Sequence, residues 1–422
     1  MKDILKELPE LVTHGVITPA TAQNIEAYYA SKKAPECSGL LAVFGIIGAV
    51  LTGLGIILIF AHNWDTFTKT TKTLLALLPL IVFQGLTAYA LITKKTARWT
   101  EPAGVLLFFA VGASIALIAQ VYNIPGNLAG YLCTWTLLCL PLVYILRSNA
   151  LAVLHIVFST YYAFETGFGS LEKPWMYLFF MGALMPFYIN RLRKYPTAAS
   201  TSFLNLLLPV SCTICLGFFL DFAYKFNVVI YIAFFGLLYS ISLLPALKRN
   251  PMHSGSYGFL SQLGIVVLLL VTSSKWFWEV QTGNMAFSRH TLPVEIIFLA
   301  LSLYFALWKA DGRKRFDPFL VAIFSFPVIY LTGFAAPHIA TILTNLLVLG
   351  LGIAIIRNAA VEYDLRRLNL GLLVVSALII CRFFDTNMSF AIRGLMFVIV
   401  GLGFFFANYI LIRKKKDHEI TK

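Results

Sequence analysis

The chain has 422 residues, of which 59% are hydrophobic and only 12% are charged, and its formal net charge is +14. Soluble domains carry about 25% charged residues, so this composition excludes a water-soluble globular protein. The apolar residues form repeated runs of about 20 residues, which is the length that a helix needs to cross a bilayer. The sequence therefore predicts an all-α protein, a polytopic transmembrane helical bundle.

Residues 1–38 are polar and are predicted to form a small cytoplasmic helical hairpin. Gly15 is placed to end a first helix, because glycine readily adopts the left-handed conformation of a C-cap. Thr18 and Pro19 are placed to begin a second helix, as N-cap and first-turn residue. The hairpin is too small for a core of its own, so we expect it to pack on the membrane domain or on a cytoplasmic partner.

Residues 39–412 are predicted to form the transmembrane domain, and a basic cytoplasmic tail is predicted at 413–422. Fourteen candidate spans are expected, at 39–61, 73–93, 103–121, 128–146, 149–165, 174–190, 203–220, 227–247, 257–274, 293–308, 316–332, 338–356, 368–384 and 394–412.

The positive charges predict the orientation of these spans. With the N-terminus in the cytoplasm, most of the 33 Lys and Arg residues fall in the alternate loops that then face the cytoplasm. This bias is the positive-inside rule, and it places both termini in the cytoplasm. Topology and anionic lipid therefore explain the net charge, and we do not expect nucleic acid as a partner.

Three stretches of the sequence resemble a known family. They are LVTHGVITPATAQNI at residues 11–25, the first span running into AHNW at 61–64, and residues 111–151. These stretches are similar to DUF2157, a family of bacterial multi-pass membrane proteins, and residues 366–416 resemble the ends of its members. The resemblance implies a bacterial inner (cytoplasmic) membrane protein, and it assigns no substrate, cofactor or catalytic residue.

Polar side chains within or at the ends of the spans are the candidate binding residues, because such groups are costly in a membrane. Most of them fall at the predicted outer helix ends, where they could line one outward-facing cavity. The alternative is that they are ordinary helix-end residues, which water solvates. The candidates are Asn63, Trp64, Asp65, Gln84, Gln120, Asn123, Glu165, Asp221, Arg382, Asp385 and Arg393.

The sequence shows no metal-ligand spacing and no phosphate-binding loop, so neither a metal nor another cofactor is expected. Cys212 and Cys215 form a C-x-x-C within a span, and packing is the favoured interpretation there. His155, in the middle of a span, is expected to be a hydrogen-bonded packing residue rather than a ligand.

Three functions are compatible with this pattern. The favoured one is a transporter or flippase-like protein, whose ligand would be a small molecule or a lipid-linked compound. The first alternative is a non-catalytic scaffold or sensor that uses residues 1–38 to bind a partner. The second is a membrane enzyme that acts on a lipid-linked substrate from the outer face, with Asp65 as its carboxylate. The short outer loops favour a non-enzymatic role.

Overall fold

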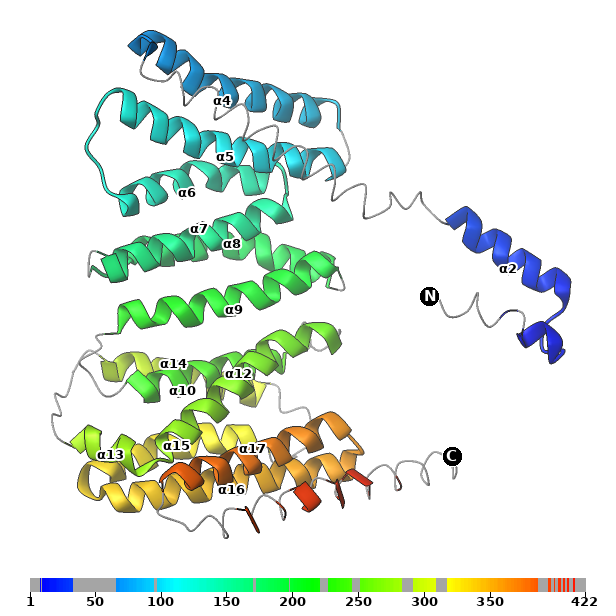
Figure 1. Ribbon diagram of the computed structural model, residues 1–422, viewed down its shortest axis with the longest axis vertical. Helices are drawn as coiled ribbons and strands as arrows, with labels where there is room; N and C mark the ends of the chain where they lie inside the picture. Colours follow the sequence, from blue (N-terminus) through cyan, green and yellow to red (C-terminus); the bar gives the residue numbers. More distant parts are fainter. Residues whose placement is uncertain are drawn as a thin grey trace. The chain divides into compact units, whose positions relative to one another are not determined.

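The computed structural model describes residues 8, 10–32, 66–94, 97–169, 172–196, 198–220, 227–244, 251–282, 291–308 and 317–385, with scattered positions between 394 and 413. Within these residues the regular structure is helical and no strand is present, which confirms the all-α prediction (Figure 1). The chain divides into two compact units, Met1–Leu75 and Ala76–Lys422.

The first unit contains the expected helix boundaries. Residues 10–13 are helical, and Gly15 follows them with a φ of 69°. Helix α2 (Pro19–Lys32) begins directly after Thr18, whose side-chain hydroxyl accepts a hydrogen bond of 3.3 Å from the Thr21 amide. The cap residues therefore act as predicted, while the domain boundary at residue 38 stays a prediction.

The remaining helices follow one another along the chain, and each predicted span between 73 and 384 coincides with one of them to within several residues. The first predicted span, 39–61, lies outside the described residues, and the last, 394–412, is described only at scattered positions. The helices are α4 (Lys69–Ile92), α5 (Ala97–Val121), α6 (Leu128–Ile145), α7 (Asn149–Phe164), the π-helix η2 (Glu165–Gly169), α8 (Trp175–Lys194), α9 (Ala199–Phe219), α10 (Asn227–Ser242), α12 (Pro251–Thr272), α13 (Lys275–Thr282), α14 (Thr291–Trp308), α15 (Pro318–Ala335), α16 (Pro337–Glu362) and α17 (Leu365–Asp385).

The length and apolarity of these helices fit a bilayer. Among the described residues, six helices are long and apolar enough to cross a membrane: α4, α5, α6, α9, α15 and α16. Three shorter apolar stretches lie at Asn227–Ser242, Ser256–Thr272 and Pro293–Leu307. The protein is thus an integral, multi-pass membrane protein in a lipid bilayer, and the count of fourteen spans stays a prediction.

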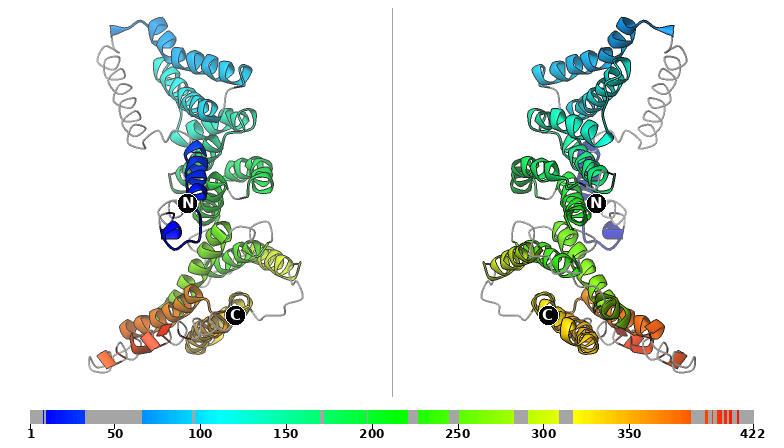
Figure 2. Two further views of the ribbon diagram at one scale, coloured as in Figure 1. Left: turned by 90° about the vertical axis from the view of Figure 1, so that its right-hand side faces the viewer. Right: turned by 90° about the vertical axis from the view of Figure 1, so that its left-hand side faces the viewer.

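Two hydrophobic clusters organise the second unit. The first cluster is formed by α5 to α9, around fully buried residues such as Phe108, Ile156 and Phe180. The second cluster is formed by α10, α12, α13 and α15 to α17, around residues such as Trp278 and Phe326. In the second cluster, green to orange in Figure 2, α16 contacts α15 and α17, and α10 contacts α12 and α14.

A buried hydrogen-bonded group connects the two clusters. The Tyr188 hydroxyl on α8 donates to Oδ1 of Asn205 on α9, over 2.6 Å. It also lies 3.1 Å from the hydroxyl of Tyr257 on α12. These side chains are buried, so the neutral group joins the first cluster to the second without placing a charge in the bilayer.

Each cluster contains a tryptophan packed directly on a glycine. A Cβ atom added to Gly112 would lie 2.3 Å from Cε2 of Trp135, and one added to Gly333 would lie 2.1 Å from Cζ3 of Trp278. The indole N–H of Trp135 donates to the Phe108 carbonyl over 2.8 Å, and that of Trp278 donates to the Thr272 carbonyl over 2.7 Å. Only glycine allows these rings to approach so closely, as is common in membrane helix packing.

Candidate functional site at the outer helix ends

The structure places five of the predicted site residues. Gln84 is exposed in the middle of α4, Gln120 is exposed near the end of α5, and Asn123 is exposed in the following turn with a φ of 50°. Glu165 is half-buried at the start of η2, and Arg382 is half-buried in the last turn of α17.

The other predicted residues are not placed. Asn63, Trp64, Asp65, Asp221 and Arg393 lie outside the described residues, as does the side chain of Asp385. Of the placed residues, Gln120 and Glu165 lie on helices of the first cluster, whereas Arg382 lies on a helix of the second. A single cavity lined by all of these residues therefore stays a prediction. Among the placed charged residues, Arg382 in the second cluster donates a hydrogen bond to a neighbouring segment.

Arg382 takes part in a polar group that joins three helices. Its Nη2 atom donates to the Ser273 hydroxyl over 3.2 Å, in the turn between α12 and α13. The side-chain amide of Asn345 on α16 donates to the Ser273 carbonyl over 2.8 Å and to the Thr341 carbonyl over 2.7 Å. Arg382 thus reaches a neighbouring helix, which goes beyond the local pairing with Asp385 that the i, i+3 spacing allows.

Trp278 of α13 lies beside this group, because its indole N–H binds the carbonyl of Thr272, the residue before Ser273. The Trp278 ring is also 5.6 Å, between ring centroids, from the Tyr330 ring on α15. Contacts therefore run from Arg382 through the α12–α13 turn and Trp278 to the C-terminal part of α15.

Glu295 completes this region, and the sequence analysis did not single it out. Its side chain is only 8% exposed, near the start of α14, and it lies within electrostatic range of Tyr330. Within the described residues, Glu295 forms no hydrogen bond or ion pair. Burying a carboxylate without such partners is costly. A buried ionisable residue in an apolar helix is therefore a functional candidate.

These residues together form a candidate site, which we call the outer polar site: Asn345, Ser273, Trp278, Tyr330, Glu295 and Arg382. They come from α13 to α17 and from the turn between α12 and α13. A guanidinium and a carboxyl at low dielectric can each bind an opposite charge by charge-assisted hydrogen bonds. The arrangement suits a zwitterionic or anionic ligand.

The comparison with known families concerns the N-terminal third of the chain. Residues 9–152 match the family DUF2157, described as "Predicted membrane protein". This match confirms the resemblance found in the sequence, over about the first third of the chain. No curated protein and no solved structure matches the chain.

The segment that matches DUF2157 contains a half-buried carboxylate with different surroundings. The carboxylate of Glu101 on α5 accepts hydrogen bonds from the Ser148 hydroxyl and from the amides of Asn149 and Ala150, the last two at 2.9 and 3.0 Å. These donors form the N-terminus of α7, where exposed amides and the helix dipole favour an anion. Glu101 thus caps the N-terminus of α7 with its side chain and holds α5 against α7.

Several other polar side chains of the first cluster are neutral and hydrogen-bonded to one another or to the backbone. Nε2 of His155 lies 3.1 Å from the Phe180 carbonyl, so this histidine is a hydrogen-bonded packing residue, as predicted. The Tyr177 hydroxyl lies 2.8 Å from the Ser211 hydroxyl and donates to Cys212 Sγ over 3.7 Å. In the described part of the chain, no group of three or more His, Cys, Asp or Glu residues could hold a metal ion.

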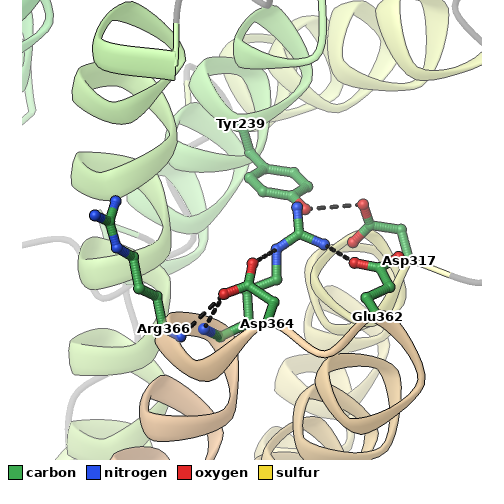
Figure 3. A network of polar contacts seen from close by, with 6 residues as sticks. Tyr239, Asp317, Glu362, Asp364 and Arg366 are labelled. Carbon is green, nitrogen blue, oxygen red and sulfur yellow. Dashed lines mark hydrogen bonds and ion pairs between the residues drawn. The ribbon is translucent and has the colours of Figure 1, made fainter. Parts of the chain in front are cut away.

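Charged residues also gather at the opposite ends of the second cluster's helices (Figure 3). The Tyr239 hydroxyl of α10 donates to Oδ2 of Asp317 over 2.8 Å, and Oδ1 of Asp317 accepts from the Phe319 amide at the start of α15. Arg367 pairs with Glu362 at 2.7 Å and with Asp364 at 3.6 Å. This network closes the turn between α16 and α17, and each of its carboxylates has a partner.

Proposed function

We propose that this protein is a transporter or flippase-like protein of the bacterial inner membrane, with both termini in the cytoplasm and a ligand site at the outer helix ends. One observation carries the proposal. A buried carboxyl, Glu295, lies without a hydrogen-bonding partner among the described residues, in the region where Arg382 joins α17 to α12. A group that is costly to bury and does not stabilise its surroundings is best explained by a ligand that binds it.

The chemistry of the site suggests the ligand class. The Arg382 guanidinium would bind a carboxylate or phosphate, preferably with two parallel hydrogen bonds. The Glu295 carboxyl would bind an ammonium group or a hydroxyl of the same molecule. The ligand is therefore a small zwitterionic or anionic compound, either free or attached to a lipid. Asn63, Asp65, Gln120, Asn123, Glu165 and Asp221, which are predicted at the same membrane face, are proposed to extend the site.

Transport is tested with the full-length protein in proteoliposomes. Solid-supported membrane electrophysiology measures currents on addition of zwitterionic amino acids and of mono- and dicarboxylates. Dithionite quenching of a fluorescent phosphatidylglycerol measures lipid flipping in the same vesicles. The test variants are Glu295→Gln and Arg382→Gln. Their controls are Glu279→Gln, in an exposed ion pair on α13, and Arg366→Gln, at the other end of α17.

We expect one of the two assays to exceed that of empty vesicles, and both test variants to lower it at least about tenfold, because a lost hydrogen bond to a charged group costs about 1.5–3 kcal/mol. The controls should retain the wild-type signal. Wild-type protein that gives neither a current nor flipping would overturn the proposal. So would test variants that match their controls. Loss of function only on deletion of residues 1–33 would support the scaffold or sensor role instead.

A further inference from the structure

A groove follows one face of the C-terminal half of α16. Its volume is about 510 Å³, within the range of about 300–1,000 Å³ that is typical of ligand sites. Gly350 and Ile353 line its apolar part, and Arg357 and Asn358 line the part nearer the helix C-terminus. The groove is thus apolar at one end and polar at the other, where Arg357 is its cation and Glu362 its carboxylate.

The length of α16 places the polar end at the membrane surface. The helix has 26 residues, which corresponds to about 39 Å at 1.5 Å per residue. A hydrocarbon core is only about 30 Å thick, so about 9 Å of α16 extends beyond it, and the charged residues Arg357 and Glu362 favour the C-terminal end for the headgroup region. Arg357 lies at this end, while Gly350, about 10 Å deeper by the same rise, lies at the depth of acyl chains.

The neighbouring acidic residues do not neutralise Arg357. Glu362, which also lines the groove, pairs with Arg367 at 2.7 Å, and Asp364 accepts from the amide of Arg366 and pairs with Arg367 (Figure 3). Arg357 itself forms no hydrogen bond or ion pair with any residue that the structure describes. Its charge is therefore available to an anion that enters the groove.

We propose that this groove binds one anionic phospholipid, with its phosphate at Arg357 and Asn358 and an acyl chain along Gly350 and Ile353. A guanidinium and an amide provide the donors that a phosphate diester needs. The apolar part contacts a chain that the bilayer supplies at the same depth. The groove lies near the α16–α17 turn, at the opposite end of these helices from the outer polar site. Lipid binding there is therefore independent of the proposed transport.

The experiment is native mass spectrometry of the full-length protein in detergent, with added dioleoylphosphatidylglycerol, dioleoylphosphatidylcholine or inorganic phosphate. Arg357→Gln removes the charge. Gly350→Leu fills the apolar part, where no described atom lies within 4 Å of an added Cβ. Arg366→Gln is the matched control, since its exposed side chain extends away from Glu362 and Asp364 in Figure 3.

We expect wild-type protein and Arg366→Gln to retain phosphatidylglycerol in preference to phosphatidylcholine. Arg357→Gln should retain it about fivefold less, the ratio that corresponds to about 1 kcal/mol for one basic residue at an anionic surface. Gly350→Leu should also lose the bound lipid, while the protein keeps its wild-type melting temperature. Equal retention of both lipids, or equal loss in Arg366→Gln, would overturn the proposal. Displacement of the lipid by inorganic phosphate alone would show a free-anion site, which also contradicts it.

Discussion

Glu101 and Glu295 are both carboxylates at helix ends of one membrane protein, yet their surroundings differ completely. Glu101, on α5, accepts four hydrogen bonds from Ser148, Asn149 and Ala150 at the start of α7. Glu295, in the second-cluster region, is 92% buried (8% exposed) and has no hydrogen bond within the described residues. The first arrangement stabilises the fold, whereas the second does not, and we propose that a bound ligand offsets its cost.

The difference between Glu101 and Glu295 coincides with the limits of the family match, because Glu101 lies inside the matched segment and Glu295 lies outside it. The segment shared with DUF2157, residues 9–152, contains Glu101, its α7 partners and the Trp135–Gly112 contact. The outer polar site, with Glu295 and Arg382, lies entirely beyond that segment. We infer that the matched segment provides mainly packed framework, and that the rest of the chain provides the two charged groups of the ligand site, Glu295 and Arg382. The following variants test this division.

Replacing Glu101 should have the largest effect. Glu101→Ala removes the acceptor from four donors at the start of α7, and we expect a loss of about 3 kcal/mol in the free energy of unfolding. Thermal unfolding in detergent measures this as a lower melting temperature. Glu172→Ala, at an exposed glutamate, is the control. Equal melting temperatures for the two variants would remove the structural role assigned to Glu101.

Filling the space beneath the two tryptophans should have the next largest effect. Gly112→Ala and Gly333→Ala each place a methyl group within 2.5 Å of an indole ring, and each should lower the free energy of unfolding by about 2 kcal/mol. Gly350→Ala, with open space around its Cβ, should be neutral. Similar losses at the two sites would show that both clusters are equally well packed. A neutral Gly112→Ala would contradict the framework role of the matched segment.

Tyr188→Phe tests the connection between the clusters. The change keeps the ring but leaves Asn205 and Tyr257 without the shared hydroxyl, which should cost about 1 kcal/mol. Hydrogen exchange followed by mass spectrometry should show faster exchange in both α9 and α12. Faster exchange confined to α9 would mean that the two clusters open independently of each other.

Ser114→Ala should have the smallest effect. The Ser114 hydroxyl donates to the Ala76 carbonyl over 2.8 Å and so joins α5 to α4. Hydrogen bonds between membrane helices contribute about 0.6 kcal/mol on average, so the melting temperature should fall by only a small amount. A loss as large as that of Glu101→Ala would show that α4 belongs to the framework more firmly than its exposed surface suggests.

Much of the fold follows from the sequence, because apolar run length and charge alternation determine where membrane helices lie. The helix caps at Gly15 and Thr18 were equally predictable, since they depend only on neighbouring residues. The role of Glu101 was not, because its α7 partners lie 48 and 49 positions further along the chain. Only the packing of α5 on α7 brings them together.

Glu295 could have been found from the sequence. It is an acidic residue inside the apolar stretch Pro293–Leu307, which is the pattern that marks functional residues in membrane helices. Arg382 was predicted, but its contact with Ser273 was not, since the two residues are 109 positions apart. Helix α13 was missed because its eight residues are too short and too amphipathic to register as a span.

The most direct test of this division is to compare Glu295→Met with Glu101→Met by melting temperature, in lipid nanodiscs and without added ligand. Methionine keeps the approximate volume of glutamate and removes its charge. We expect Glu295→Met to melt at or above the wild-type temperature, because a buried carboxylate without a partner among the described residues is removed, and Glu101→Met to melt well below it. A Glu295→Met variant destabilised as strongly as Glu101→Met would contradict the account, since Glu295 would then be a structural residue.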